Sequence, residues 1–146
     1  MSTGTALDVT ILKNNNKLTR FYTGMPSYDS FLAIVDYLEP KAKEMIGWNS
    51  IKTKELNISG KQCVPRCFSS MSIANQLFSV LIRLRLGLLA ADVSMRFKIS
   101  ESTYCRLFTT WICFLSKELR LLFPFPTRQQ VDDWMPRSFK KHFPNT

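Results

Sequence analysis

Two runs of helical periodicity, separated by a short break, constrain the fold of this chain more than any other feature. Leu89, Val93 and Phe97 recur every four residues, which places them on one face of a short helix. Ser100 is typical of an N-cap, because its hydroxyl can accept a hydrogen bond from the free backbone N–H groups of the next turn. Beyond it, the residues that recur at spacings of three and four are Thr103, Leu107, Thr110, Trp111, Phe114 and Leu115.

Two helices joined by three or four residues are the layout of a helix-turn-helix, whose second helix enters a major groove by its N-terminal end. Here we expect Arg106 to read a guanine edge or to anchor on a phosphate. Glu101 can accept a hydrogen bond from a cytosine amine, and the first-turn N–H groups and hydroxyls, including that of Thr103, can take a phosphate. The candidate DNA-binding residues are Arg83, Arg85, Arg96, Lys98, Ser100, Glu101, Ser102, Cys105 and Arg106.

Each of these residues also has a structural interpretation. Arg106 can pair with Glu101 or with Asp92 instead of binding a nucleotide, and Tyr104 can pack in the core or reach the groove. The basic residues before the second helix can be an ordinary solvated face. These alternatives remain open from the sequence.

The charge balance favours a polyanionic partner. The 146-residue chain carries 20 Lys and Arg against 11 Asp and Glu, a formal net charge of +9. Residues 71–146 hold 11 of the basic and five of the acidic residues, a balance of +6, so the excess lies with the proposed helix-turn-helix. A basic balance of this size raises the odds of binding nucleic acid or an anionic surface. No stretch has the uninterrupted apolar length of a membrane span.

The remaining patterns predict an all-α fold. Residues 1–20 are polar and weakly patterned, and we expect a flexible lead. Residues 21–47 should form a helical hairpin arm with an apolar stripe, stopped at Pro40, and residues 48–70 a linker or long loop that leaves the arm loosely attached. Residues 71–122 should form the helix-turn-helix domain, with Ser72 as an N-cap and Gly87 as a C-terminal stop. Residues 123–146 should be a proline-rich connector with short helices, one of them capped by Thr127.

The scaffold helix of the helix-turn-helix domain should bury the stripe formed by Ile73, Leu77, Val80, Leu81 and Leu84. Arg83 and Arg85 lie off that stripe. A helix with this stripe, together with the two helices of the turn motif, would surround one core.

The four cysteines do not predict a disulfide framework or a metal centre. Cys63 and Cys67 could hold half of a zinc site, but the single histidine, His142, is far away in the sequence. No signal peptide precedes them, so reduced thiols are the default interpretation. We therefore expect no cofactor for this chain.

Several stretches resemble the helix-turn-helix region that precedes the catalytic domain of Harbinger-like DDE transposases. The resemblance lies in the sequence segments LIRLRLGLLAADVS, RFKISESTYCRLFTTWICFLSKELR and PFPTRQQVDDWMPRSFKKHFPNT, with FYTGMPSYDSFLAIVDYL upstream. It covers residues 21–146 with a gap between Lys41 and Ser70. The family usually has glycine where this chain has Lys98, and usually reads S-T-V-S-R where this chain reads Ser102-Thr103-Tyr104-Cys105-Arg106.

The resemblance implies a DNA-binding, nuclear, transposase-derived protein. In the family, the segment similar to FPNT leads into the nuclease domain, so we expect a chain that stops before that domain and is not catalytic alone. DDE chemistry needs three carboxylates around two divalent metal ions, and these would belong to that domain. Asp132 and Asp133 are adjacent and would diverge on a helix.

Three functions remain in competition: a module that binds double-stranded DNA, a helical module that binds a partner protein or itself, and a fragment of a longer, active endonuclease. Salt dependence separates the first two, since phosphate contacts weaken steeply with salt. The cytoplasm remains an alternative to the nucleus.

Overall fold

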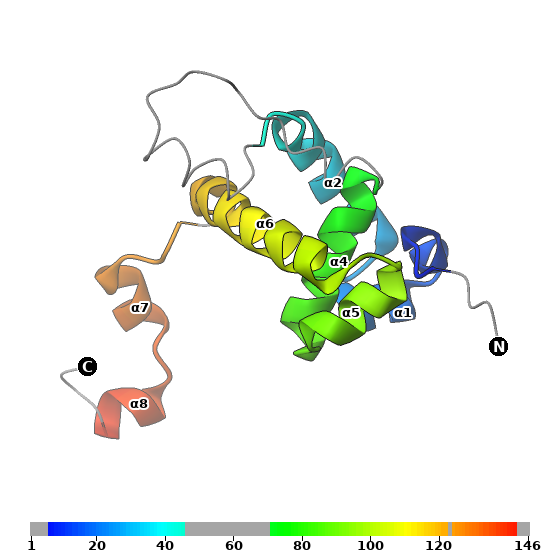
Figure 1. Ribbon diagram of the computed structural model, residues 1–146. Helices are drawn as coiled ribbons and strands as arrows, with labels where there is room; N and C mark the ends of the chain where they lie inside the picture. Colours follow the sequence, from blue (N-terminus) through cyan, green and yellow to red (C-terminus); the bar gives the residue numbers. More distant parts are fainter. Residues whose placement is uncertain (1–5, 46–70, 123, 143–146) are drawn as a thin grey trace, which may run out of the picture. The chain divides into compact units, whose positions relative to one another are not determined.

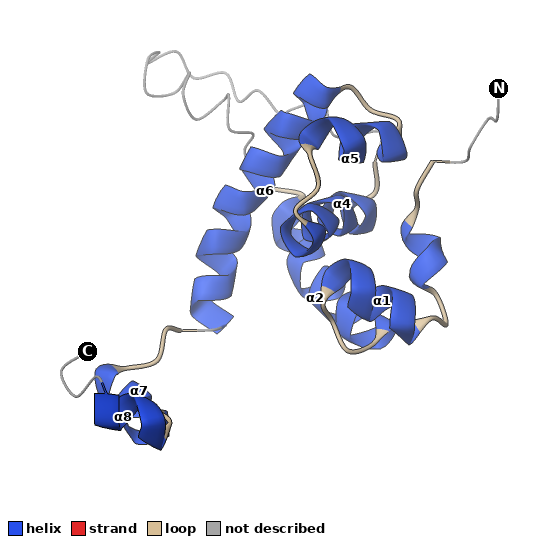
Figure 2. Ribbon diagram, turned by 90° about the horizontal axis from the view of Figure 1, so that it is seen from below, coloured by secondary structure: helices blue, strands red, loops and turns tan. Residues whose placement is uncertain are grey.

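A computed structural model of the protein describes residues 6–45, 71–122 and 124–142. Within these ranges the chain forms seven α-helices and one short 3-10 helix and contains no strand, which confirms the predicted all-α class (Figure 2). The elements are η1 (Val9–Leu12), α1 (Asn16–Thr23), α2 (Tyr28–Ala42), α4 (Ile73–Leu86), α5 (Ala90–Phe97), α6 (Glu101–Leu122), α7 (Arg128–Trp134) and α8 (Arg137–His142).

The chain divides into two compact units, Met1–Phe114 and Leu115–Thr146. The first unit holds η1, α1, α2, α4, α5 and α6 up to Phe114, and the second holds the end of α6 with α7 and α8. The linker predicted for residues 48–70 lies outside the described residues.

Helix α4 is the central element of the first unit, and the other helices pack against it (Figure 1). Its Phe78 is fully buried and makes edge contacts with three rings, those of Tyr22 in α1, Phe31 in α2 and Phe97 in α5. Edge-to-face packing suits aromatic rings, because the positive edge of one ring meets the negative face of the next. One side chain therefore joins the N-terminal helices to the helix-turn-helix.

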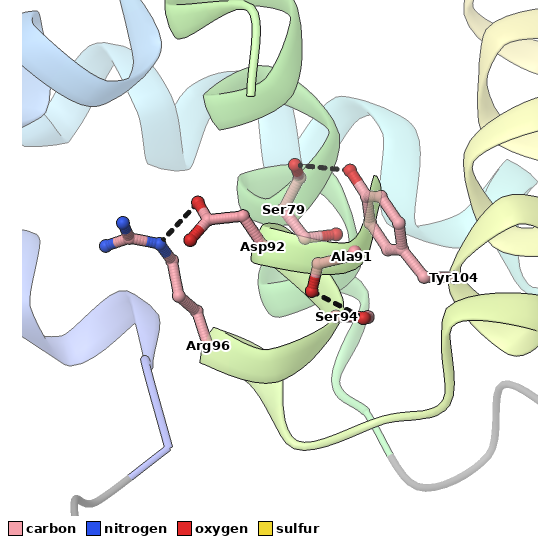
Figure 3. Close-up of polar contacts among 6 residues, drawn as sticks. All are labelled: Ser79, Ala91, Asp92, Ser94, Arg96 and Tyr104. Carbon is pink, nitrogen blue, oxygen red and sulfur yellow. Dashed lines mark hydrogen bonds and ion pairs between the residues drawn. The ribbon is translucent and has the colours of Figure 1, made fainter. Parts of the chain in front are cut away.

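Two buried hydrogen bonds join α4 to α6. The Trp111 indole N–H donates to Gln76 Oε1 at 2.9 Å, and the Tyr104 hydroxyl donates to the Ser79 carbonyl at 3.1 Å (Figure 3). Burial raises the pKa of Tyr104 to about 12. Tyr104 is fully buried, so the side chain belongs to the core and does not reach the groove.

The prediction of a flexible lead over residues 1–20 is wrong for the described part of that segment. Asn15 caps α1, and Leu12 and Thr19 are completely buried. Asn75, in the first turn of α4, holds the segment at two points. It accepts from the Val9 backbone N–H at 2.7 Å and donates to Asp8 Oδ2 at 2.7 Å. These bonds join residues more than 60 positions apart, so the hydrophobic periodicity of residues 1–20 does not predict them.

The helical arm also differs from the prediction. Ser27 is the N-cap of α2, and the helix continues through Pro40, the predicted stop, to Ala42. Pro40 has no backbone N–H to donate, and it lies in the last turn of the helix. Phe31, Val35 and Leu38 are buried as the stripe predicts, but they face α4. The arm is therefore an integral part of the first unit and not a loosely attached hairpin.

The predicted ends of α4 are confirmed, but its buried face is wider than the stripe. Ser72 accepts from the Asn75 N–H, and Gly87 takes a left-handed conformation at the C-cap. Phe78 and Ile82 are fully buried as well as Leu77 and Val80, whereas Leu84 is 55% exposed. A central helix contacts neighbours on several sides, so more than one stripe is apolar.

The second unit contains two short helices without a buried residue. Thr127 caps α7 as predicted, in a capping box with Gln130, and α7 ends at Trp134. α8 runs from Arg137 to His142.

Candidate DNA-binding surface

A three-residue turn connects α5 to α6, as the sequence predicts for a helix-turn-helix. Lys98 follows α5 in the left-handed conformation, with φ 54° and ψ 43°. The Ile99 N–H donates to the Ser94 carbonyl at 3.0 Å and the Lys98 N–H to the Met95 carbonyl at 3.2 Å, which is the pattern of a Schellman motif. A lysine therefore occupies the position that glycine usually takes in such a turn.

The N-terminal segment braces this turn from outside the helix pair. The Leu7 backbone N–H donates to the Arg96 carbonyl at 2.7 Å. Arg96 lies in the last turn of α5, where carbonyls lose their partners within the helix. A residue from the opposite end of the unit thus satisfies a carbonyl next to the turn.

Ser100 caps α6 as predicted. Its hydroxyl accepts from the Thr103 N–H at 3.2 Å and lies 2.7 Å from Thr103 Oγ1 and 3.2 Å from Ser102 Oγ. The N–H groups of Glu101 and Ser102 have no acceptor among the described residues, and the Glu101 side chain is exposed beside them. A helix N-terminus with free N–H groups favours an anion.

One exposed face of α6 follows directly from this cap. Ser102, Cys105 and Arg106 are exposed at spacings of three and four, and Thr109 extends the face by one turn. Thr109 was absent from our candidates, although its spacing from Cys105 and Arg106 identifies it. The opposite face of α6, with Tyr104, Leu107 and Trp111, is buried. The cap and the buried stripe together orient the exposed face outward.

Arg106 is free on this face. It forms no ion pair or side-chain hydrogen bond with any described residue. The predicted alternative partner Asp92 instead binds Arg96, with 2.9 Å between Asp92 Oδ2 and Arg96 Nε (Figure 3). The hydrogen bond from Arg96 to Asp92 raises the Arg96 pKa. Arg96 and Lys98 are both exposed beside the turn, but Arg96 is already partly neutralised.

Arg83 and Arg85 lie on different sides of α4. The Arg83 guanidinium is 4.2 Å from the ring centroid of Phe108 and 5.8 Å from that of Tyr104, so it packs on α6. The Arg85 side chain lies against Gly24, at the end of α1. The structure therefore brings Arg83 together with the α6 residues and does not bring Arg85 there.

The described residues contain no group of three or more His, Cys, Asp and Glu side chains placed to hold a metal ion. Cys105 and Cys113 lie on α6, whereas Cys63 and Cys67 lie outside the described residues. No described helix is long and apolar enough to cross a membrane.

Comparison with known families gives a match that coincides with this part of the fold. Residues 69–121 match the family model described as the helix-turn-helix of DDE superfamily endonuclease. The matched range contains α4, α5 and all but the last residue of α6. Comparisons with curated proteins and with solved structures give no significant match. The segment that carries the candidate surface is thus similar to the helix-turn-helix of DDE superfamily endonucleases.

Proposed function

We propose that residues 71–122 bind double-stranded DNA and that α6 enters the major groove by its N-terminal end. The observation that carries this proposal is the exposed face of Ser102, Cys105 and Arg106, continued by the half-buried Thr109, which begins at the cap and lies opposite the buried stripe. A recognition helix needs this division, because one face must be fixed by the core while the other meets base edges.

The charged side chains and the free N–H groups have distinct tasks in this proposal. Arg106, which has no side-chain partner among the described residues, donates two hydrogen bonds to the O6 and N7 atoms of a guanine. The free N–H groups of Glu101 and Ser102 take a phosphate of the backbone, while the Glu101 carboxylate is placed to accept from a cytosine amine. Lys98 and Arg96 contact backbone phosphates beside the turn, and Arg96 must compete with its pair to Asp92.

The role of Arg83 is to fix the recognition helix. Stacking on Phe108 fixes the orientation of the Arg83 guanidinium, which limits the directions in which its N–H groups can donate. Its remaining N–H groups can reach a phosphate that flanks α6. Arg85, beside Gly24, contributes only general positive charge.

We further infer that this module belongs to a Harbinger-like transposase, acts in the nucleus and does not cleave DNA by itself. The family match, and the order along the chain of the segments that resemble Harbinger-like transposases, support the transposase origin. DDE chemistry needs three convergent carboxylates, and a catalytic domain on the same or another polypeptide would supply them with their divalent metal ions. Incubation of the chain with labelled duplex and Mg²⁺ or Mn²⁺ tests this part, since strand cleavage would contradict it.

The main test is selection from a random duplex pool at about 0.15 M salt, where the Debye length is about 8 Å. We expect an enriched motif, and Arg106→Ala should cost about 1–3 kcal/mol and relax one base position. The matched control is Arg120→Ala, which removes the same charge on α6 roughly 21 Å further along the helix axis. The control should keep the motif. No retention of duplex by the folded chain would overturn the proposal.

A second candidate is a module that binds a partner protein or a second copy of itself. Leu89 is 76% exposed and Met95 is 74% exposed, which favours an apolar contact near α5. The predicted helical stripe places Leu89 in the core with Val93 and Phe97, but Leu89 is the N-cap residue of α5 and projects into solvent. Affinity for a protein partner through these side chains would change little with salt, in contrast to binding of DNA.

A further inference from the structure

Helix α8 carries a concentrated positive charge that the helix-turn-helix does not account for. Arg137, Lys140 and Lys141 occur at spacings of three and four and are all exposed, so they share one face of the helix. Within α8 there is no acidic residue, and none of the three forms an ion pair or side-chain hydrogen bond with a described residue. His142 ends the same helix.

The neighbouring helix α7 differs in this respect. Arg128 pairs with Asp132, with 3.1 Å between Nε and Oδ1, and Asp133 follows. The positive charge of α7 is therefore compensated locally, whereas that of α8 is not. We call the set Arg137, Lys140 and Lys141 the α8 basic face.

Like charges at these spacings repel one another. Neighbouring side chains three and four residues apart on a helix have Cβ atoms about 5–6 Å apart, which is inside the Debye length of about 8 Å at physiological salt. Neither helix has a buried residue, so no burial of apolar side chains within these helices offsets the repulsion between the charges. A polyanion placed against the α8 basic face would remove the repulsion and release counterions.

We propose that the α8 basic face binds the phosphate backbone of duplex DNA, as a second contact on the molecule that α6 reads. This inference rests on the proposed function for the source of the duplex, and charge complementarity selects the occupant. Because both surfaces belong to one chain, the second contact is intramolecular once the first has formed, and even weak phosphate binding raises the overall affinity. Contacts with phosphate carry no sequence information, so the α8 basic face should strengthen binding to all duplexes alike.

The experiment compares two triple variants with the same loss of charge. The test variant is Arg137→Gln, Lys140→Gln and Lys141→Gln. The control variant is Lys13→Gln, Lys17→Gln and Arg20→Gln, which neutralises three exposed cations in the first unit. Binding of a labelled duplex of about 30 base pairs is measured by fluorescence anisotropy across a range of NaCl concentrations. Circular dichroism verifies that each variant keeps its helix content.

We expect the test variant to reduce the slope of log affinity against log salt by roughly 0.9 for each lost contact, or about 2.7 for three. Its affinity at 0.15 M salt should fall by about fivefold per contact, which follows from the same slope referred to 1 M salt. The control variant should change neither quantity. An unchanged slope in the folded test variant, or an equal decrease in both variants, would overturn the proposal.

The same assay separates this inference from the proposed function. If Arg106→Ala abolishes the selected motif while the test variant keeps the wild-type slope, α6 reads DNA and the α8 basic face does not bind it. If the test variant lowers the slope while Arg106→Ala leaves base preference unchanged, α8 binds phosphates and the reading role of α6 is refuted.

Discussion

The turn between α5 and α6 contains a correctable strain. Lys98 has φ 54° and ψ 43°, a conformation in which the side chain of an L-residue crowds the following carbonyl. Glycine has no Cβ and adopts this conformation freely. Lys98→Gly should therefore increase the free energy of unfolding, although it removes a side chain.

The magnitude follows from two opposing effects. A left-handed residue other than glycine costs about 1–2 kcal/mol. Glycine gains entropy in the unfolded chain, which offsets roughly 0.5–1 kcal/mol of that gain. The expected net stabilisation is about 0.5–1 kcal/mol, or an increase of a few degrees in the melting temperature.

Urea unfolding followed by circular dichroism measures this change. The control is Ala33→Gly at an exposed position inside α2, which should lose roughly 0.5–1 kcal/mol because glycine there weakens a helix. DNA binding should change in the opposite direction, since Lys98→Gly removes one candidate phosphate contact and should reduce the salt slope by about 0.9. A lower free energy of unfolding for Lys98→Gly would refute the reasoning, because it would mean that the lysine side chain contributes more than the strain costs.

Three further predictions concern the buried contacts. Gln76→Leu should cost about 1–3 kcal/mol in urea unfolding by leaving the Trp111 indole N–H without its acceptor, whereas Gln129→Leu, at an exposed site, should change little. The pKa of Tyr104 is raised to about 12 from an ordinary value near 10. Its contribution to stability is therefore complete below pH 10 and is lost as the pH rises from about 10 to about 12. Tyr104→Phe should flatten the curve of unfolding free energy against pH over that range. Leu7→Pro deletes the N–H that donates to the Arg96 carbonyl and should speed amide hydrogen exchange at Lys98 and Ile99. The control Ala6→Pro should not speed it. Equal exchange rates in the two variants would show that the Leu7 hydrogen bond does not hold the turn.

Local chemistry made the helix ends predictable. Ser72, Gly87, Ser100 and Thr127 each act at the position that the sequence indicates, because a cap depends only on its own residue and the next turn. The buried positions of α5 and α6 at Val93, Phe97, Leu107 and Trp111 follow from helical spacing in the same way.

Long-range contacts made the rest unpredictable from periodicity. Leu12 and Thr19 belong to a polar segment, and they are buried because Asn75 and the helices of the first unit fix that segment in place. Pro40 is a strong local stop signal, yet the last turn of α2 includes it. Leu89 matches the periodicity of α5 but lies at its N-cap, before the helix turns it toward the core.

The sequence presents the arginines of the candidate surface as equivalent cations, and the structure gives each a different state. Arg83 is stacked on an aromatic ring, Arg96 is paired with a carboxylate, and Arg106 has no side-chain partner within the part of the chain that the structure describes. A base contact requires a guanidinium whose donors are free to meet two acceptors, and a paired or stacked arginine must first give up an existing contact. This difference in starting state is why we assign base reading to Arg106 and backbone contact or packing to the other two. It also predicts the order of their effects, because replacing Arg83 should reduce stability before it reduces selectivity, whereas replacing Arg106 should do the reverse.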